Sequence, residues 1–393
     1  MKVLQINSYP NGSTGAIAKS IHNALQKNGD ESVFAYGIGK SCETDFKIGT
    51  ELDFKLHTYA TLLTGLHGYF SKSNTKRLID FIKKENPDIV HLHNIHGGYI
   101  NLQILLNFLK KYNKKTVITL HDCWLFTGKC YHFYEAGCEK WKENCGNCPQ
   151  KAMYPKSIFF DRTSKMLNDK KELFKNFPNL HITAVSDWLS QVAKESFLGE
   201  YPITVISNGV DTCIFKPEKY DDINEKYNLN GKFVILGVAS SWNSNKGLNE
   251  FIGLSKRLNE NEIIVLVGVT EEIKNCIGIT RTENKNELAK LYSRADAFLN
   301  FSVQETFGLV TAEAMACGTP AIVSNTTACG DIVTEGTGFK IPPRDINSAY
   351  KCIKEIQKNN SESYRESCVS HINENYTIEK MTDSYIALYQ SLN

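Results

Sequence analysis

The chain has 393 residues, more than one ordinary hydrophobic core accommodates, so two domains are expected. Hydrophobic residues make up 41% and charged residues 22%, which is typical of a globular protein and excludes a disordered or fibrous one. The net charge of +2, from 45 basic and 43 acidic residues, lacks the basic surplus of nucleic-acid-binding proteins. Nucleic acid is therefore not an expected partner.

Membrane insertion is not expected, because no stretch reaches the roughly 18 apolar residues that a span needs. The N-terminal run Met1–Asn7 is too short and too polar for a signal peptide, and it predicts a first buried strand. We expect a cytoplasmic protein, with peripheral contact at the inner face of a membrane as the closest association.

Short apolar runs alternate with helical patterns along the chain, which indicates β-α units on parallel sheets. Pro87 is expected to end a helix and begin a strand. The expected strands are Lys2–Asn7, Ser32–Gly37, Asp88–His93, Lys115–Leu120, His181–Val185, Lys232–Val238, Glu262–Val267, Ala297–Asn300 and Thr319–Ser324. The expected helices are Arg77–Lys84, Leu102–Tyr112, Leu248–Leu258, Asn286–Ala295 and Phe307–Cys317.

The pattern stops and restarts around Tyr201–Gly231, which is rich in Pro, Asn, Asp and Gly and predicts a linker. The predicted fold class is α/β, with two Rossmann-like, doubly wound domains facing each other across a cleft. The expected domains are residues 1–204 on the acceptor side and 205–375 on the nucleotide-sugar side. A C-terminal helix, 376–393, is expected to return to the first domain after a break near Tyr376.

Residues 287–320 predict helix, strand, loop, helix and strand in succession. Thr306 is expected to cap the second helix, and Gly318 is expected to end it in the left-handed conformation. Free amides at such a helix start suit a diphosphate. These donor-binding amides belong to Phe307, Gly308 and Leu309, and Gly308 also lacks a side chain that would block close approach.

Two carboxylates flank this helix start: Glu305 before it and Glu313 inside it, with seven residues between them. Two carboxylates beside a phosphate site are costly, because they repel the phosphates. The cost is offset if they accept hydrogen bonds from hydroxyls, such as those of a sugar and a ribose. The pair and its surroundings resemble the signature of the family 4 retaining glycosyltransferases of the GT-B fold, over nearly the whole chain. The resemblance implies that Glu305 contacts hydroxyls of the transferred sugar and Glu313 the ribose. Two ordinary surface glutamates are the alternative, which the surrounding sequence disfavours.

The resemblance implies further site residues in the first domain. Gly15, in the glycine-rich turn Ser8–Gly15, becomes a donor-contact candidate, although a plain β-α turn is the alternative. His121 ends a strand and corresponds to the family histidine that reaches the donor sugar and its phosphate. For His91, His93 and His96, packing or acceptor lining is expected at least as much as a role in the chemistry, and metal binding is not expected.

The expected phosphate clamp departs from the family pattern. The family places an arginine five residues before the lysine of a Lys-Gly pair, and both cations hold the diphosphate. Lys246 is present, but the arginine position is Ser241. The second cation is either missing or supplied by Arg281 or Lys285.

The segment Val205–Asp211 resembles the hinge motif that leads into the second domain of the family. A turn is expected at Asn208-Gly209, where both residue types favour one.

Four of the twelve cysteines lie in a polar insertion, Trp124–Gln150. The closing Cys-Gly-Asn-Cys resembles the knuckle of a thiolate zinc site, and His132 could replace one thiolate. Such a metal would be structural, because four thiolates leave no open position. Reduced thiols or disulfides are the alternatives. The four candidate ligands are Cys130, Cys138, Cys145 and Cys148.

The predicted activity is a retaining, hexosyl-type transfer from a UDP- or GDP-sugar to a hydroxyl of a glycan or lipid-linked acceptor. The resemblance implies bacterial surface-polysaccharide biosynthesis, with Lys246, Glu305 and His121 as catalytic residues and no cofactor required for catalysis. A sugar-nucleotide epimerase of the same fold is one alternative. A non-catalytic nucleotide-sugar-binding subunit, which would explain Ser241, is another.

Peripheral membrane contact is considered for the aromatic, apolar stretch Tyr59–Phe70. A core helix is the alternative, and it is slightly favoured. Three basic residues follow the stretch: Lys72, Lys76 and Arg77.

Overall fold

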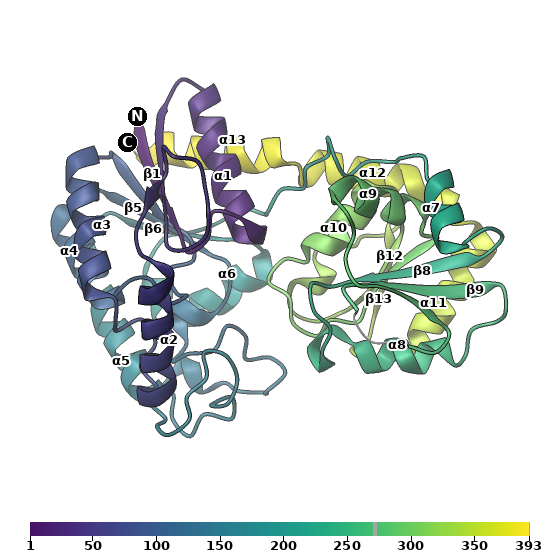
Figure 1. Ribbon diagram of the computed structural model, residues 1–393, viewed down its shortest axis with the longest axis horizontal. Helices are drawn as coiled ribbons and strands as arrows, with labels where there is room; N and C mark the ends of the chain where they lie inside the picture. Colours follow the sequence, from purple (N-terminus) through teal and green to yellow (C-terminus); the bar gives the residue numbers. More distant parts are fainter. Residues whose placement is uncertain (270–272, 393) are drawn as a thin grey trace. The chain divides into compact units, whose positions relative to one another are not determined.

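The structure is a computed structural model that describes residues 1–269 and 273–392. The chain forms two compact units, drawn in Figure 1. Unit 1 comprises Met1–Ile206 and Thr382–Asn393, and unit 2 comprises Ser207–Met381. Asn393 lies outside the described residues. The chain therefore passes between units after Ile206 and after Met381. The junctions expected from the sequence, after residues 204 and 375, lie a few residues earlier.

Unit 1 is built on a seven-stranded parallel sheet in the order β3-β2-β1-β4-β5-β6-β7. The central strands are almost continuously apolar because helices cover both faces of such a sheet. Leu4 and Ile6 of β1, for example, are fully buried. The strands are β1 (Lys2–Asn7), β2 (Glu31–Tyr36), β3 (Phe46–Lys47), β4 (Ile89–Leu92), β5 (Lys115–Leu120), β6 (Leu180–Ala184) and β7 (Ile203–Val205).

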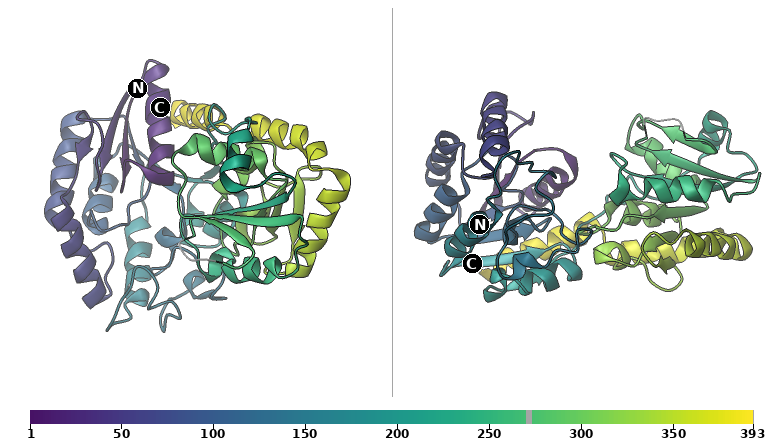
Figure 2. Two further views of the ribbon diagram at one scale, coloured as in Figure 1. Left: turned by 45° about the vertical axis from the view of Figure 1, so that its right-hand side comes forward. Right: turned by 90° about the horizontal axis from the view of Figure 1, so that it is seen from below.

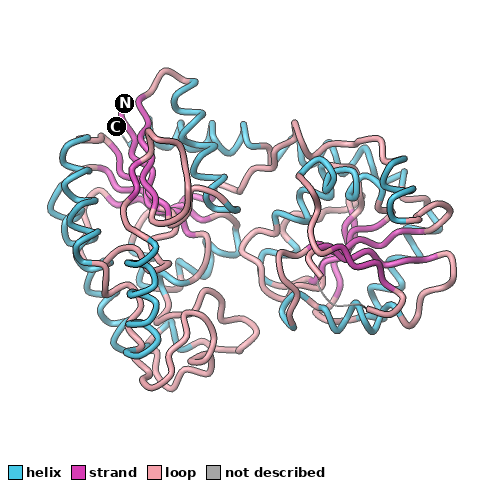
Figure 3. Tube along the Cα trace, viewed as in Figure 1, coloured by secondary structure: helices cyan, strands magenta, loops and turns pink. Residues whose placement is uncertain are grey.

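The helices of unit 1 flank this sheet (Figure 3). Helix α4 shows why they form: Asn101 accepts a hydrogen bond from the Ile104 amide as N-cap, and leucines at helical spacing fill its buried face. The helices are α1 (Gly12–Lys27), α2 (Glu51–Thr64), α3 (Lys72–Glu85), α4 (Leu102–Tyr112), α5 (Thr163–Phe174) and α6 (Asp187–Lys194).

Unit 2 repeats the architecture with a six-stranded parallel sheet in the order β10-β9-β8-β11-β12-β13. Its core centres on Ile235, Phe251, Ile264 and Phe301, all fully buried. The strands are β8 (Phe233–Val238), β9 (Glu262–Val267), β10 (Cys276–Ile279), β11 (Ala297–Asn300), β12 (Ala321–Ser324) and β13 (Gly338–Ile341). The helices are α7 (Asp221–Tyr227), α8 (Leu248–Ser255), α9 (Lys285–Arg294), α10 (Leu309–Ala316), α11 (Ile346–Asn359) and α12 (Glu362–Asn375).

The last helix, α13 (Ile378–Leu392), begins in unit 2 and ends in unit 1. The expected break near Tyr376 is confirmed, because α12 ends at Asn375 and α13 begins at Ile378. In unit 1, Tyr385 and Tyr389 of α13 are buried, and the two chain ends lie side by side in every view (Figure 2).

The expected linker Tyr201–Gly231 does contain the junction after Ile206, but it also contains β7 and α7, which belong to the two units. The expected turn within it is wrong. No turn forms at Asn208-Gly209, and the next residue, Val210, forms an isolated parallel bridge with Thr377. Glycine is required at 209 for close approach, since a Cβ there would lie 2.5 Å from Cα of Ile378.

Within the described residues, no helix is both long and apolar enough to cross a bilayer. The slightly favoured core-helix interpretation of Tyr59–Phe70 is wrong for its first part. Tyr59 and Leu63 of α2 are 64% and 50% exposed, so they do not belong to the core.

Candidate functional site

Each sheet has a switch point, where strand order reverses about a central strand. In unit 1, β1 is flanked by β2 and β4; in unit 2, β8 is flanked by β9 and β11. Ligands of doubly wound sheets bind beyond the carboxyl ends of the strands at this point. The loops after β1 and β4, and those after β8 and β11, are therefore where site residues should gather.

The switch point of unit 1 opens into a cavity of about 550 Å³. The loop after β1, Ser8–Thr14, forms one side, and residues after β4 form another. Tyr131 of the cysteine insertion and Tyr154 just after it complete the wall. Its volume and its mixture of aromatic and polar walls suit a sugar-sized ligand.

A histidine–aspartate pair lies beside this cavity. His96, a lining residue, has its Nε2 2.7 Å from Oδ2 of Asp122, and the Asp122 Oδ1 accepts the Trp124 amide at 2.8 Å. Burial opposes ionisation of Asp122, but the nearby His96 and these hydrogen bonds hold its pKa below the usual value. Asp122 thus acts as an anion that fixes the His96 ring.

His121 lies next to this pair but is buried in a different chain of hydrogen bonds. Its Nε2 is 3.1 Å from Nδ1 of His93, whose Nε2 is 2.8 Å from Oε1 of Gln5. Burial lowers the pKa of His121 to about 4, so the ring is neutral near neutral pH. Since Gln5 Oε1 can only accept, His93 donates to it and accepts from His121. A donor-sugar contact by His121 stays a prediction.

The other two histidines of the expected cluster divide between packing and the cavity. His91 is fully buried, with Nδ1 2.6 Å from the Tyr389 hydroxyl and Nε2 2.7 Å from Oγ1 of Thr119. It therefore joins α13 to the sheet, as does His93 through Gln5. Of the three, only His96 lines the cavity.

Gly15 lies inside the first turn of α1, one residue beyond the cavity lining. A Cβ there would lie 2.7 to 2.9 Å from backbone atoms of Tyr9 and Pro10. Glycine is thus needed so that α1 can pack against the loop after β1. Its contact with a donor stays a prediction.

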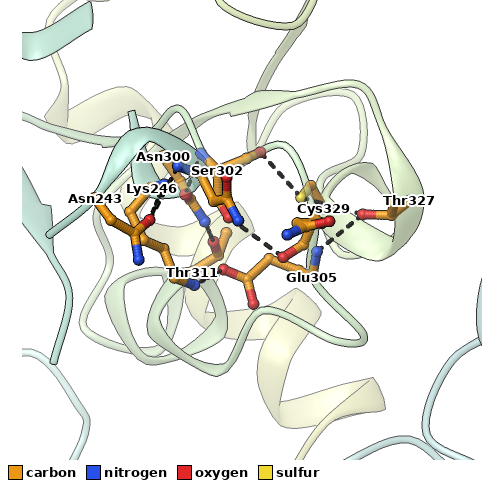
Figure 4. A network of polar contacts seen from close by, with 10 residues as sticks. Asn243, Lys246, Asn300, Ser302, Glu305, Thr311, Thr327 and Cys329 are labelled. Carbon is orange, nitrogen blue, oxygen red and sulfur yellow. Dashed lines mark hydrogen bonds and ion pairs between the residues drawn. The ribbon is translucent and has the colours of Figure 1, made fainter. Parts of the chain in front are cut away.

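In unit 2, two predicted site residues meet at the switch point. The Lys246 Nζ donates to Oε1 of Glu305 at 2.5 Å, joining the loop after β8 to the loop after β11 (Figure 4). The Glu305 amide in turn donates to Oγ1 of Thr327 at 3.0 Å. The pair balances its own charge and keeps a cation and a carboxylate together at the switch point of unit 2.

Backbone geometry holds Lys246 in position. The Asn243 side chain accepts the amides of Asn245 and Lys246, which caps a short turn. Gly247 then has φ of 78°, and a Cβ on it would lie 2.2 Å from Cβ of Phe301. The Lys-Gly sequence is therefore explained by close packing of the two loops that carry the ion pair.

The helix beyond Glu305 begins later than expected. α10 starts at Leu309 with Gly308 as N-cap, so the prediction that Thr306 caps it is wrong. Gly308 has φ of 97°, in the left-handed region that favours glycine, and a Cβ there would meet nothing closer than 3.7 Å. Conformation rather than close approach explains Gly308. Gly318, with φ of 90°, follows the helix as predicted.

Glu313 lies on α10 and accepts a hydrogen bond from the Tyr292 hydroxyl at 3.2 Å. Burial raises the pKa of Glu313 to about 7, while that hydrogen bond and the positive charge of Lys285 oppose the rise. A carboxyl in this state can exchange its proton for a hydrogen bond from a ligand hydroxyl.

The candidates for a second phosphate cation have different surroundings. Ser241 is exposed and carries no charge. Lys285, at the start of α9, is close enough to Glu313 to act on its charge, and Arg281 is exposed in the preceding loop. A role for Lys285 or Arg281 as the second cation stays a prediction.

The four cysteines of the insertion line one small cavity of about 10 Å³. The Cys145 sulfur accepts the Gly128 amide and the Cys148 sulfur accepts the Gln150 amide. Within the described residues, however, no three histidine, cysteine, aspartate or glutamate side chains are arranged to hold a metal ion. The thiols share a space without being gathered around one point.

Sequence reasoning missed the role of Asp122 and of the cavity tyrosines. Asp122 directly follows the predicted site residue His121 at the end of β5, which is the signal that could have found it. Tyr9, Tyr131 and Tyr154 come from three separate loops, so no local pattern unites them.

Comparison with known proteins identifies the class. Residues 15–213 match the family described as Glycosyltransferase Family 4, and residues 219–374 match Glycosyl transferases group 1. Because the first match covers half of the chain, the protein belongs to glycosyltransferase family 4. It is a glycosyltransferase of the GT-B fold, as the sequence predicted.

Two relatives match this chain in sequence, one over its whole length and one over about half of it. WcaC of Escherichia coli K12, described as a colanic acid biosynthesis glycosyl transferase, is 24% identical over 100% of both chains. The O-antigen chain mannosyltransferase RfbU of Salmonella typhimurium is 30% identical over 45% of this chain and 51% of its own.

Solved structures show the same fold over the full length. Sucrose-phosphate synthase of Thermosynechococcus elongatus has a TM-score of 0.70 at 15% identity, covering 100% of this chain and 98% of that one. HepE of Anabaena, solved with UDP-glucose, has a TM-score of 0.67 at 14% identity, covering 100% of each chain.

Proposed function

We propose that this glycosyltransferase moves a hexose from a UDP- or GDP-sugar to a hydroxyl of a glycan or lipid-linked acceptor, with retention of anomeric configuration. The observation that carries the proposal is the Lys246–Glu305 ion pair at the switch point of unit 2, beside the start of α10. The names of WcaC and RfbU support bacterial surface-polysaccharide biosynthesis as the setting.

In the proposed reaction, the bond from the anomeric carbon to the diphosphate oxygen breaks, and a bond to the acceptor oxygen forms on the same face. The acceptor proton passes to the departing phosphate oxygen. The Lys246 ammonium group moves partly away from Glu305 and toward the diphosphate, and Glu305 then accepts hydrogen bonds from sugar hydroxyls. Cations fixed where negative charge develops lower the barrier because they need no reorganisation.

Glu313 is proposed to bind the ribose. Its pKa of about 7 means that it is partly protonated near neutral pH, and ribose hydroxyl donors favour its carboxylate form. His121 is proposed to act from unit 1 as a neutral ring, and the tyrosine-lined cavity beside His96 is proposed to receive the acceptor.

The first experiment is a thermal-shift screen with UDP-, GDP- and ADP-sugars, because a ligand that binds the folded state raises the melting temperature without any acceptor. One donor should stabilise the wild type and fail to stabilise Glu313→Ala, while Glu260→Ala on the surface serves as the control. No response to any donor in the folded wild type would refute the proposed donor. Binding without any transfer would favour the non-catalytic alternative. That alternative is supported by Ser241, an uncharged residue at the position of the phosphate-binding arginine.

We also propose that the four insertion thiols hold a structural zinc ion after small side-chain rotations. Two buried lysine side chains lie nearby, Lys129 and Lys170, and both are bonded to backbone carbonyls. Burial lowers the pKa of both amines, that of Lys170 to about 7, and the two negative charges of a zinc tetrathiolate would favour their charged forms. The metal content of reduced protein should fall from about one equivalent to none in Cys148→Ser and stay unchanged in Cys213→Ser, whose cysteine is exposed. A metal-free wild type would refute the zinc.

A further inference from the structure

Helix α2 turns an apolar face to solvent. Leu52, Leu56, Tyr59 and Leu63 are 66%, 59%, 64% and 50% exposed. Their spacing of four, three and four residues places them on one side of the helix, whereas His57 on another side is buried. A surface helix normally directs its apolar stripe toward the core, so this face requires a different explanation.

The exposed face continues into a neighbouring loop. Ile158, Phe159 and Phe160 are 45%, 63% and 49% exposed, and the Ile158 amide donates to the Leu62 carbonyl at 3.0 Å. At the end of α2, a Cβ on Gly65 would lie 2.7 Å from the Phe160 carbonyl oxygen, so helix and loop are in close contact. The four α2 residues and these three loop residues together form the apolar strip.

Basic side chains accompany the apolar strip: Lys55 is on α2 next to Leu56, and Lys156 and Arg162 stand on either side of the loop residues 158–160 in sequence. Lys55, Lys156 and Arg162 are exposed, and the Arg162 guanidinium lies 5.0 Å from the centre of the Phe160 ring. The acidic groups of α2 are confined to its first turn, where Asp53 is engaged by Thr50 in a capping box. Aromatic and aliphatic side chains beside cations are the composition that binds the interface of an anionic bilayer.

We propose that the apolar strip seats unit 1 on an anionic lipid bilayer. Lipid phosphates would neutralise the three cations, whereas a second copy docked through the same strip would bring the cations of both copies together. A fluid lipid surface has no preformed groove, and an apolar helix flank with a neighbouring loop can insert into it without one.

The apolar strip is linked to the cavity at the unit 1 switch point. Tyr154 lines that cavity and is itself 55% exposed, and it belongs to the same loop as Ile158. A bilayer under this loop would bring lipid headgroups near the mouth of the cavity. Resting on the proposed function, this arrangement selects an acceptor carried by a membrane lipid over a free glycan.

Sedimentation of the full-length chain with vesicles tests the proposal. Vesicles of phosphatidylglycerol and phosphatidylethanolamine should bind the wild type about tenfold better than phosphatidylcholine vesicles. The double variant Leu56→Asp/Tyr59→Asp should lose this binding. Tyr134→Asp, which alters a 44% exposed tyrosine outside the strip, should keep it. All altered side chains are exposed, and unchanged melting temperatures would show that the variants fold.

Wild type that stays in the supernatant, or a double variant that binds as wild type does, would overturn the proposal. Sedimentation velocity without lipid gives a further outcome: a wild-type dimer that the double variant converts to monomer would assign the strip to a second copy and also overturn it. The donor thermal shift should be the same in the double variant and in Tyr134→Asp as in the wild type, because Glu305 and Glu313 lie in unit 2. Loss of donor response with vesicle binding intact would instead refute the proposed function alone.

Discussion

The switch points of the two sheets have the same topology but different chemistry. In unit 2, backbone turns and the Lys246–Glu305 ion pair occupy the position, and the paired residues come from the loops after β8 and β11. In unit 1, an open cavity is walled by tyrosines from three loops and by His96, which is paired with Asp122. On the proposed function, the donor diphosphate would be bound by an ion pair held in place by backbone turns, whereas the acceptor would enter an open cavity built from several loops.

Removal of Lys246 should give the largest effect, because it strips the unit 2 site of its paired cation. We expect Lys246→Ala to lower kcat/KM by about 100- to 1000-fold. Steady-state transfer assays test this, with Lys290→Ala, a lysine paired to Asp222 on the surface, as the control. Activity within a few-fold of wild type would show that another cation carries the leaving group.

The His96–Asp122 pair should govern the acceptor rather than the donor. Asp122→Asn removes the charge that orients His96 and should lower kcat/KM for the acceptor by about tenfold or more. Asp169→Asn, which alters a partly buried carboxylate bonded to Lys165 and to the Tyr69 hydroxyl, is the control because Asp169 does not line the cavity. If the variant also loses the donor thermal shift, the division of labour between the two switch points is wrong.

Donor affinity should depend on pH through Glu313. Its pKa is raised from 4.5 to about 7 in the folded chain. Below pH 7, donor binding must expel this proton, so affinity should fall by up to about tenfold per pH unit, with proton release visible by calorimetry in two buffers. Glu313→Gln should show neither effect, and a flat wild-type profile would contradict the role.

The raised pKa of Glu313 also makes the stability of the folded chain depend on pH. Between pH 4.5 and about 7 the folded chain keeps a proton that the unfolded chain has released. The free energy of unfolding should therefore decline as pH rises through this window, relative to that of Glu313→Gln. Denaturant titrations of both proteins at several pH values measure the difference.

A smaller effect is expected where α13 meets the sheet of unit 1. The Tyr389 hydroxyl contacts both the Gln5 side chain and Nδ1 of His91. Tyr389→Phe leaves these buried groups without that partner and should lower the free energy of unfolding by about 1 to 3 kcal/mol. Tyr134→Phe, at an exposed position, should change it little, and equal stability of the two variants would contradict this account.

The strands that sequence reasoning found and missed differ in position. Central strands such as β1 and β9 were predicted to the residue because their apolar runs are continuous. The four strands not predicted, β3, β7, β10 and β13, are the edge strands of the two sheets. Edge strands are short and partly exposed, so they lack that signal; only one residue of β13 is buried, for example.

The site divides in a similar way. Lys246, Glu305 and Glu313 could be predicted because they lie in one recognisable stretch and its partner loop. The left-handed φ of Gly308 could not, because it depends on where α10 begins. The exposed face of α2 was predicted only in part. Tyr59 and Leu63 lie in the stretch considered for membrane contact, whereas Leu52 and Leu56 precede it. A core helix was slightly favoured because an apolar helical pattern is the same whether its stripe meets a core or a membrane.

The placement of α13 bears on how unit 1 can be isolated. Residues 1–206 alone would leave the sheet without Tyr385 and Tyr389, and their buried hydroxyl contacts with Thr119 and His91 would be lost. The chain ends lie side by side in unit 1 (Figure 2). A circular permutant that begins at Ile378, joins Leu392 to Met1 through a short linker and ends at Ile206 would therefore hold the complete unit in one uninterrupted chain.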